Sequence, residues 1–358
     1  MASTWPTEIA LLRELVAIPS VSGEEEAVAR HVEAVALGWG LATVRDGVGV
    51  SVRVPGQAPG PTLAFVSHLD VVPPGSGWTR DPFTPVIEGH QLFGRGSGDA
   101  KASVATMLTA AHDLAGEGGP PRGDLLLLFG YGEETRNTSM PELVAKAGPI
   151  DAAVVGEPTS LDVAIAQRGL MMLDLVAQGD QRHAGRVADD GPFTNAVTAL
   201  ARNLVRLESL FADRPHPLLG NPTVTPTMLT AGVSRNVTPP QARAVLDVRS
   251  TPLWSHAELA EGLVAALDCE VIVTSDRLVP CETPAGSRLL AASGAVRPQA
   301  SRYGSPTCSD WVFLRHVDAV KCGPGSSSRS HTPDECVDLP DVTAARRFYA
   351  DLAREYLA

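Results

Sequence analysis

The sequence lacks several features that mark common classes of protein. Its five cysteines are odd in number and none forms a C-x-x-C pair, so neither a disulfide framework nor a thiolate zinc site is expected. No stretch approaches the roughly 18 uninterrupted apolar residues of a membrane span. The N-terminus also has no basic segment followed by an apolar run, as a secretion signal would. We therefore expect a cytoplasmic protein.

Basic residues are also scarce. The chain has 29 lysines and arginines against 41 aspartates and glutamates, which gives a net charge of −12. Because such a field repels phosphate backbones and anionic lipid headgroups, neither nucleic acid nor a membrane is an expected partner. The 358 residues, of which 44% are hydrophobic, are instead enough for two domains with well-filled cores.

The first 167 residues have the pattern of an α/β domain. An amphipathic helix is expected between Thr7 and Pro19, and Ser22 with Glu25 fits a capping box ahead of a second helix. Short apolar runs then alternate with a helical stretch, which indicates a largely parallel sheet covered by helices. The runs occupy residues 49–54, 62–67, 125–130 and 152–155, and the helical stretch occupies 102–114.

The pattern changes near Arg168. The expected elements follow the order strand, helix, strand, strand, helix, strand, which is the ferredoxin-like order of a small α+β domain. They fall at residues 170–177, 194–211, 223–233, 242–249, 256–267 and 270–274. After Pro280 the α/β pattern returns and ends in a helix at 339–357. The sequence thus predicts an α/β domain of residues 1–167 and 278–358, with an α+β domain of residues 168–277 inserted into it.

A histidine and an aspartate follow one of the apolar strands. The run at 63–66 leads directly into Ser67-His68-Leu69-Asp70, and alternate residues of a strand share a face. His68 and Asp70 are expected to point the same way at the carboxyl end of this strand, where open α/β sheets place their sites. A metal-binding histidine usually donates its other ring N–H to a carboxylate, although a surface pair fits this short motif equally well.

Other carboxylates also stand at element ends. The loop Gly94-Arg95-Gly96-Ser97-Gly98-Asp99 delivers an acid just ahead of the helical stretch, and it lacks the third glycine of a dinucleotide-binding loop. Glu133 and Glu134 follow the strand at 125–130, and Glu157 follows the strand at 152–155. Adjacent carboxylates repel each other, but next to a divalent cation one can be a ligand and the other a base.

The last candidate, His331, lies in Ser330-His331-Thr332-Pro333-Asp334-Glu335, after a Gly-Ser-rich stretch that is also typical of a solvated turn. Two histidines and several carboxylates form a nitrogen and oxygen donor set that suits zinc or cobalt. These donors are too many for one catalytic zinc ion. They fit two ions that share one carboxylate.

Taken in order, the motifs resemble the M20 metallopeptidases, and within them the acetylornithine deacetylase and succinyl-diaminopimelate desuccinylase group. The resemblance covers essentially the whole chain and is carried by S-H-L-D-V-V-P-P, W-T-R-D-P-F, G-R-G-S-G-D-A-K, G-E-E-T, G-E-P-T and G-P-G…H-T-P-D-E. It implies two zinc ions, with cobalt as a possible substitute. It also implies a homodimer in which the inserted domain serves as dimerisation and lid domain.

The resemblance further implies a role for individual residues. One ion would be held by His68 and Glu157 and the other by Glu134 and His331, with Asp99 as the bridging ligand ahead of a cis peptide bond to Ala100. Asp70 would orient His68, and Glu133 would be the general base. The implied substrate-binding residues are Arg168, His183, Asn236 and Arg249, and His183 would reach the neighbouring subunit's site.

The expected reaction is removal of an acyl group from an N-acyl-L-amino acid. N-acetylornithine is the first expected substrate, N-succinyl-L,L-diaminopimelate is the second, and an exopeptidase or dipeptidase activity is the third alternative. The rival class is a non-catalytic binding relative. Such a protein is expected to lack ligands or the base, and all of them are present in this sequence.

Overall fold

A computed structural model describes residues 5–188 and 191–358. The chain divides into two compact units, each with a hydrophobic core of its own. The first unit comprises Met1–Ile165, Thr283–Tyr303 and Ser309–Ala358, and the second comprises Ala166–Glu282 and Gly304–Cys308. The second unit is thus inserted into the sequence of the first, and residues 168–277 fall within it.

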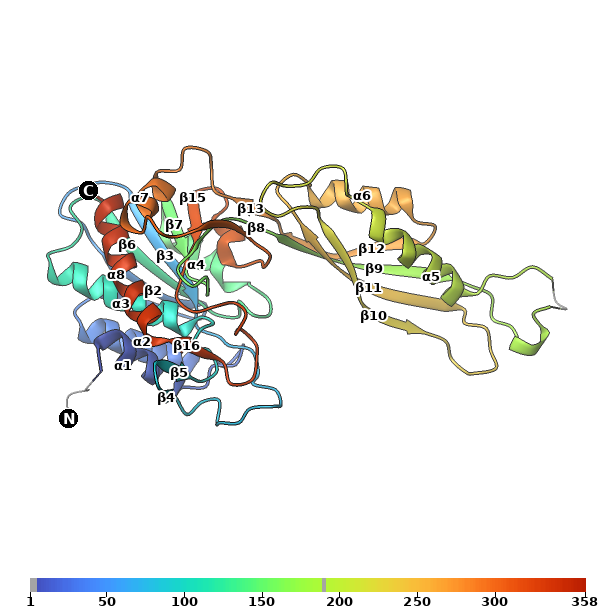
Figure 1. Ribbon diagram of the computed structural model, residues 1–358, viewed down its shortest axis with the longest axis horizontal. Coiled ribbons are helices and arrows are strands. Elements are labelled where there is room, and N and C mark those ends of the chain that lie inside the picture. Colours follow the sequence, from blue (N-terminus) through green and yellow to red (C-terminus); the bar gives the residue numbers. More distant parts are fainter. Residues whose placement is uncertain (1–4, 189–190) are drawn as a thin grey trace. The chain divides into compact units, whose positions relative to one another are not determined.

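The first unit contains a sheet with a parallel centre (Figure 1). The central strands are β6 (Asp124–Gly130), β3 (Thr62–His68), β7 (Ala152–Val155) and β15 (Asp318–Lys321), which run parallel in that order. Antiparallel strands extend it: β2 (Gly49–Val54) and β1 (Ala42–Asp46) beyond β6, and β8 (Val163–Gln167) beyond β15. β13 (Cys281–Glu282) and β14 (Arg302–Ser305) pair with β8. The central strands are nearly all buried, as expected for a sheet covered on both faces.

A second, small sheet lies in the same unit. It consists of β16 (Cys336–Asp338), β5 (Gln91–Phe93) and β4 (Val86–Glu88), with β5 in the middle. Cys336 pairs with Phe93 in antiparallel register. Since Phe93 is followed by the loop to Asp99 and Cys336 is preceded by the loop from His331, this pairing brings two expected site loops together.

Helices surround the main sheet of the first unit. They are α1 (Thr7–Val16), α2 (Glu26–Gly38), α3 (Lys101–Gly116), α4 (Ser139–Ala147), α7 (Arg288–Val296) and α8 (Leu339–Tyr356), with a short 3₁₀ helix at Asp310–Leu314. α3 packs against α1, α8 and the strands β3 and β6, and most of its residues are buried. A helix buried on almost every side belongs to a core. Among the described helices none is both long and apolar enough to cross a membrane.

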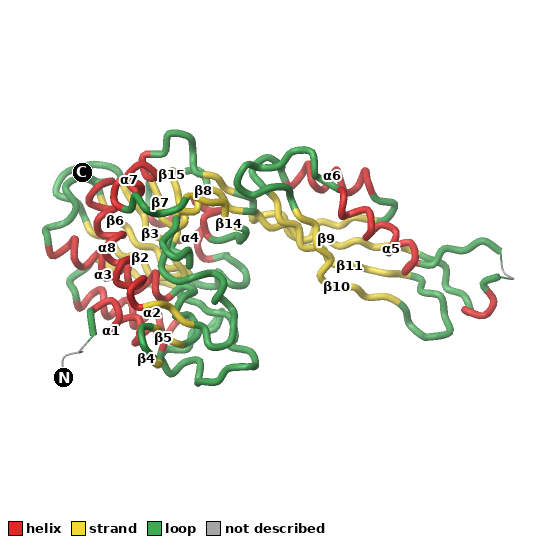
Figure 2. Tube along the Cα trace, in the orientation of Figure 1, coloured by secondary structure: helices red, strands yellow, loops and turns green. Residues whose placement is uncertain are grey.

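The second unit is an antiparallel sheet with two helices (Figure 2). Its strands stand in the order β10 (Thr223–Ala231), β11 (Gln241–Ser250), β9 (Gly169–Gln178) and β12 (Glu270–Leu278). The helices are α5 (Ala196–Arg206) and α6 (His256–Ala266), and short 3₁₀ turns lie at Ala184–Arg186 and Leu207–Ser209. β11 alternates buried and more exposed residues, as a strand covered on one face should. The expected fold class, an α/β sheet domain with an inserted ferredoxin-like α+β domain, is confirmed.

Two local predictions were wrong. The helix expected at 194–211 is shorter, because Asn195 caps α5 by accepting N–H bonds from Val197 and Thr198, and the chain after Arg206 tightens into a 3₁₀ turn. The capping box of Ser22 and Glu25 does not form, since α2 begins at Glu26 without a side-chain cap. Both side chains hydrogen-bond to distant residues instead, as described below.

Candidate metal centre

Parallel strands bring several of the expected site residues to one edge of the sheet. β3 ends at His68, β6 is followed by Glu133 and Glu134, and β7 is followed by Glu157. Because β6, β3 and β7 are neighbours that run in the same direction, their carboxyl ends meet at the same edge. Asp99 comes from the loop that leads into α3. The residues expected after these strands therefore lie at one edge of the sheet.

The loop before α3 takes a tight path. Gly96 has a φ of +82°, a left-handed conformation that favours glycine, and a Cβ there would lie 2.6 Å from Val71 Cγ1. The Asp99–Ala100 peptide bond is cis, as the resemblance implies. Asp99 itself is 9% exposed.

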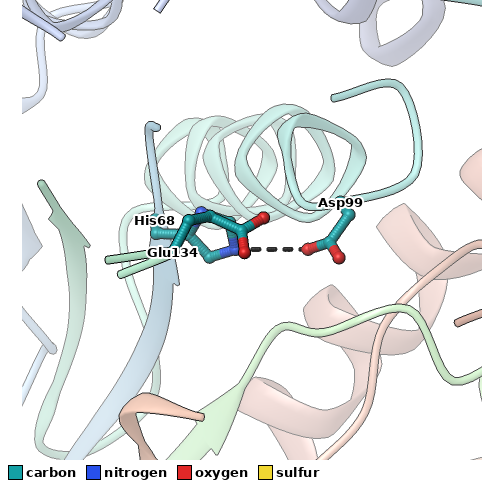
Figure 3. Close-up of side chains that lie close together, drawn as sticks. All are labelled: His68, Asp99 and Glu134. Carbon is teal, nitrogen blue, oxygen red and sulfur yellow. Dashed lines mark ion pairs between the residues drawn. The ribbon is translucent and has the colours of Figure 1, made fainter. Parts of the chain in front are cut away.

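His68, Asp99 and Glu134 form a group that could hold a metal ion (Figure 3). Each offers one ligand atom, and these atoms all lie within 4.8 Å of one another. His68 Nε2 and Asp99 Oδ1 are 3.3 Å apart. Figure 3 shows the three side chains facing one another, with His68 at the end of its strand and Asp99 in the loop beside the helix.

His331 extends this group. Its Nε2 lies 3.0 Å from Glu134 Oε1 and 3.6 Å from Asp99 Oδ2. Asp99 therefore faces His68 through one carboxylate oxygen and His331 through the other. The backbone of His331 is also unusual, with a φ of +62° in a region that residues with a Cβ rarely adopt.

Asp70 lies behind His68 and is fully buried. The hydrogen bond of His68 Nδ1 goes to the backbone carbonyl of Asp70 at 3.0 Å, while the Asp70 carboxylate oxygen Oδ1 is 3.4 Å away. That carboxylate accepts N–H bonds from Glu133 and Glu134, both at 3.0 Å, and an O–H bond from Ser22 at 2.7 Å. Asp70 thus holds His68 and the two glutamates together, which is more than the orienting role that the resemblance implies.

Among the buried side-chain atoms that make no hydrogen bond within the described part of the chain, two belong to candidate metal ligands. They are His68 Nε2 and Glu157 Oε1. Buried polar atoms normally have a hydrogen-bond partner. Two metal-ligating atoms without one in the same region therefore indicate a binding site. A divalent cation is a partner that both a neutral imidazole nitrogen and a carboxylate oxygen can bind. The residues present therefore fit a metal ion.

The electrostatics agree with a site for cations. Burial raises the pKa of Glu157 to about 8, and the charge of Asp99 adds to the effect. Burial, followed by the charge of Glu157, raises the pKa of Glu133 well above its ordinary value. Burial alone would lower the pKa of His68, but Asp70 and Asp99 outweigh it and raise this pKa well above its usual range. Ionised carboxylates that are buried close together repel one another, and a nearby positive charge stabilises them.

The expected substrate-binding residues belong to the second unit. His183 Nδ1 accepts the N–H of Gly185 at 3.1 Å, and Asn236 lies on the adjacent segment, where its carbonyl accepts the N–H of Ala184 at 2.8 Å. Arg249 pairs with Asp247 through two hydrogen bonds of 2.8 and 3.0 Å.

Arg168 has a different environment. Its guanidinium donates to the backbone carbonyls of Leu219, Asn221 and Arg249. Burial lowers the pKa of Arg168 from its usual value.

Several residues near the centre were missed by the sequence analysis. Glu25 Oε1 accepts the N–H of Gly132 at 3.0 Å, and Ser22 donates to Asp70, so the pair read as a capping box supports the glutamate loop instead. Glu335 binds the loop of Asp99 through its carboxylate. No local pattern marks these contacts, because the partners of Glu25 and Glu335 are distant in sequence.

A nitrogen and oxygen ligand group at the carboxyl ends of parallel strands, with a further carboxylate beside it, is typical of metal-dependent enzymes. Residues 64–355 match the model of peptidase family M20/M25/M40, and the chain belongs to this family. It is a metal-dependent hydrolase that acts on amide C–N bonds.

Relatives of known name cover nearly the whole chain. A succinyl-diaminopimelate desuccinylase of Rhizorhabdus wittichii is 30% identical over 97% of this chain and 97% of its own length. The crystal structure of an M20 family metallo-carboxypeptidase from Sulfolobus solfataricus has a TM-score of 0.80 at 19% identity, and covers 99% of this chain and 100% of its own. A dinuclear metal-binding M20 peptidase from Bacillus subtilis has a TM-score of 0.74 at 17% identity, with 97% and 96% coverage.

Proposed function

We propose that the chain is a di-metal amidohydrolase that removes an acyl group from an N-acyl-L-amino acid. The observation that carries this proposal is the position of Asp99, which faces His68 with one oxygen and His331 with the other. A carboxylate between two histidines suits a ligand shared by two cations. We assign His68 and Glu157 to one ion, Glu134 and His331 to the other, and Asp99 to both. The Bacillus subtilis relative is a dinuclear metal-binding peptidase, which supports two as the number of ions.

The proposed ions are Zn²⁺, with Co²⁺ as a functional substitute, because all the donors are imidazole nitrogen or carboxylate oxygen. Bound divalent cations would supply a Lewis acid for the amide carbonyl and lower the pKa of water towards neutrality.

Glu133 is the proposed general base. It follows Gly132 and precedes the proposed ligand Glu134, and it stands outside the group formed by His68, Asp99 and Glu134. Its backbone is held on both sides, by Asp70 Oδ1 through its own N–H and by Glu25 through the N–H of Gly132. Its carboxylate would take a proton from the attacking water and then deliver that proton to the leaving amine nitrogen.

The proposed substrate follows from the relatives. The name of the Rhizorhabdus wittichii enzyme makes N-succinyl-L,L-diaminopimelate the first compound to test, with N-acetylornithine as the second. We propose His183 and Asn236 as contacts to the substrate and Arg249 as the partner of a substrate carboxylate, for which a guanidinium is well shaped. The carbonyl contacts of Arg168 favour a role in holding the chain beside Arg249.

We also propose that the protein is a homodimer formed through the inserted unit, and that His183 serves the site of the neighbouring subunit.

A substrate panel tests the proposed function. N-succinyl, N-acetyl and dipeptide substrates are assayed by kcat/KM with metal-free protein, with added Zn²⁺ and with added Co²⁺. We expect no turnover without metal, recovery with either ion and the highest kcat/KM for the N-succinyl compound. Full activity of metal-free protein would contradict the di-metal hypothesis. A highest kcat/KM for N-acetylornithine or a dipeptide would instead change only the substrate.

A further inference from the structure

Glu335 is a buried carboxylate that has no part in the proposed ligand set. It is 1% exposed and lies between the loop of His331 and the first residue of β16. A buried charge is costly unless it is paired and hydrogen-bonded. The partners of Glu335 therefore indicate what it does.

All of these partners come from the loop that delivers Asp99. Glu335 Oε1 accepts the backbone N–H groups of Gly98 and Asp99, both at 3.0 Å. Oε2 accepts the N–H of Gly96 at 3.1 Å and Nη1 of Arg95 at 2.6 Å. Backbone N–H groups that converge on one point form a nest that binds anions. Here the nest is formed by the loop that leads to Asp99, and the Glu335 carboxylate accepts the hydrogen bonds of its N–H groups.

Backbone contacts reinforce this arrangement. The N–H of Gly94 donates to the carbonyl of Glu335 at 2.9 Å, and the next residue, Cys336, pairs with Phe93. The segment that carries Glu335 and, four residues earlier, His331 is therefore fastened along the loop that ends in Asp99.

Arg95 is itself buried and has further contacts. It is 1% exposed, its guanidinium lies 5.1 Å from the centre of the Trp78 ring, and Nη2 donates to the carbonyl of Pro74 at 3.4 Å. The guanidinium balances the charge of Glu335 in a place from which water is excluded. A buried pair of this kind contributes little net stability compared with apolar residues of the same volume, which favours a positioning role.

We propose that Glu335 is a positioning residue that sets the affinity for both metal ions by holding the backbone of Asp99 in place. The inference rests on the proposed function, in which Asp99 is the ligand shared by the two ions. Glu335 contacts the N–H of Asp99 and not its carboxylate, so it acts on the metal through Asp99. Loss of Glu335 must then weaken the binding of both ions, whereas loss of His331 weakens the binding of only one.

The test is metal binding by Glu335→Gln. Glutamine keeps the shape of the side chain. Its NH₂ group, however, must face N–H groups whose hydrogen bonds the carboxylate accepted. Metal-free protein is titrated with Zn²⁺ in competition with a chromophoric chelator. We expect about 10- to 100-fold weaker binding of both ions, the usual effect of removing a residue that supports a ligand. His331→Ala, measured in parallel, should lose affinity for one ion.

Glu8→Gln is the matched control. Glu8 is also 1% exposed, and its carboxylate accepts bonds from Arg346 at 2.7 Å and Thr343 at 3.0 Å on α8. The variant loses a partly buried ion pair without touching the loop of Asp99. We expect both glutamine variants to lower the Tm of metal-free protein, and only Glu335→Gln to lose metal affinity. If Glu335→Gln does not fold, Glu335→Gln with Arg95→Met removes the unbalanced guanidinium and should show the same loss.

The outcomes separate this inference from the proposed function. Wild-type affinity of Glu335→Gln for both ions, in a protein that binds two, overturns the inference and leaves the di-metal site standing. Loss of only one ion also overturns it, because the effect then does not pass through the shared ligand. A wild-type protein that binds no divalent metal overturns both.

Discussion

Asp70 shows how one residue can serve several parts of a site. Its carbonyl orients the imidazole of His68, and its carboxylate accepts the N–H groups of Glu133 and Glu134. Burial would raise the pKa of Asp70, but His68 and Ser22 hold it below its usual value. The carboxylate therefore stays ionised at neutral pH, and both of its oxygens can accept the N–H groups of the two glutamates. One acid thus fixes the backbones of both neighbouring glutamates.

The roles proposed for Glu133 and Glu134 can be separated by substitution. Glu133→Gln should lower kcat by about 10²- to 10⁴-fold, because the amide cannot accept the proton from water. Its metal content should stay near that of the wild type. Glu134→Gln should instead weaken the binding of one metal ion, since Glu134 Oε1 lies 3.0 Å from His331 Nε2 and Glu134 belongs to the ligand group.

Kinetics and metal analysis of both purified variants check this prediction. Loss of a metal ion in Glu133→Gln, or retention of most of the wild-type kcat, would reverse the assignment of the two residues.

At the scale of elements, strand ends carry the candidate ligands, and the starts of α5, α6 and α7 carry side-chain caps. β3 and β6 deliver His68 and the glutamates because their apolar residues bury the strands and leave the polar residues at the carboxyl edge. In the second unit, α6 has a true capping box. Ser255 accepts the N–H of Glu258, and Glu258 accepts the N–H of Ser255.

This capping box predicts a pH dependence of stability. The bonds from Ser255 and the ion pair with Arg214 lower the pKa of Glu258 to about 2. A carboxyl group whose pKa is depressed by folding stabilises the protein above its unfolded pKa and loses that effect as the pH falls through the folded value. The contribution of Glu258 should therefore be complete near pH 6 and decrease between about pH 4.5 and 2.

Urea unfolding of wild type and Glu258→Gln, followed at several pH values, measures this contribution as the difference between the two curves. The difference should be largest at neutral pH and shrink in acid. Ser255→Ala should cost about 1 kcal/mol at neutral pH, as loss of a serine cap usually does. A difference between wild type and Glu258→Gln that is constant from pH 6 to pH 3 would contradict the prediction.

At the scale of the whole molecule, the proposed site residues are distributed over both units. The proposed metal ligands and Glu133 belong to the first unit, whereas His183, Asn236 and Arg249 belong to the second. If the protein is a homodimer and His183 serves the partner's site, no single chain contains a complete active site.

Subunit mixing tests this. Glu133→Ala and His183→Ala proteins should each be nearly inactive as homodimers. After dissociation and random reassociation about half of the dimers are mixed, and each mixed dimer has one intact site, so activity should approach about a quarter of wild type for a closed two-fold dimer. Mass spectrometry of the mixture confirms the exchange. If exchange is complete and no activity returns, His183 acts within its own chain or has no catalytic part.

The elements that could be predicted are those defined by local patterns. The strands at 49–54 and 152–155 have the expected bounds because glycine, proline or aspartate at or next to each end interrupts the apolar pattern. Ser22 and Glu25 show the limit of such patterns. The S-x-x-E spacing occurs, but Asp70 and the N–H of Gly132 bind these side chains instead.

Sequence alone therefore determined the order of the elements, the fold class and the identity of the histidines and acids that stand at element ends. These depend on interactions between residues a few positions apart, which leave a pattern in the chain. Only the tertiary structure decided that Asp99 lies between His68 and His331, that Asp70 holds both glutamates, and that Glu335 clamps a loop 240 residues away. Such contacts depend on which strands become neighbours and in what register, here β16 on β5 and β3 on β6, and no local pattern records that pairing.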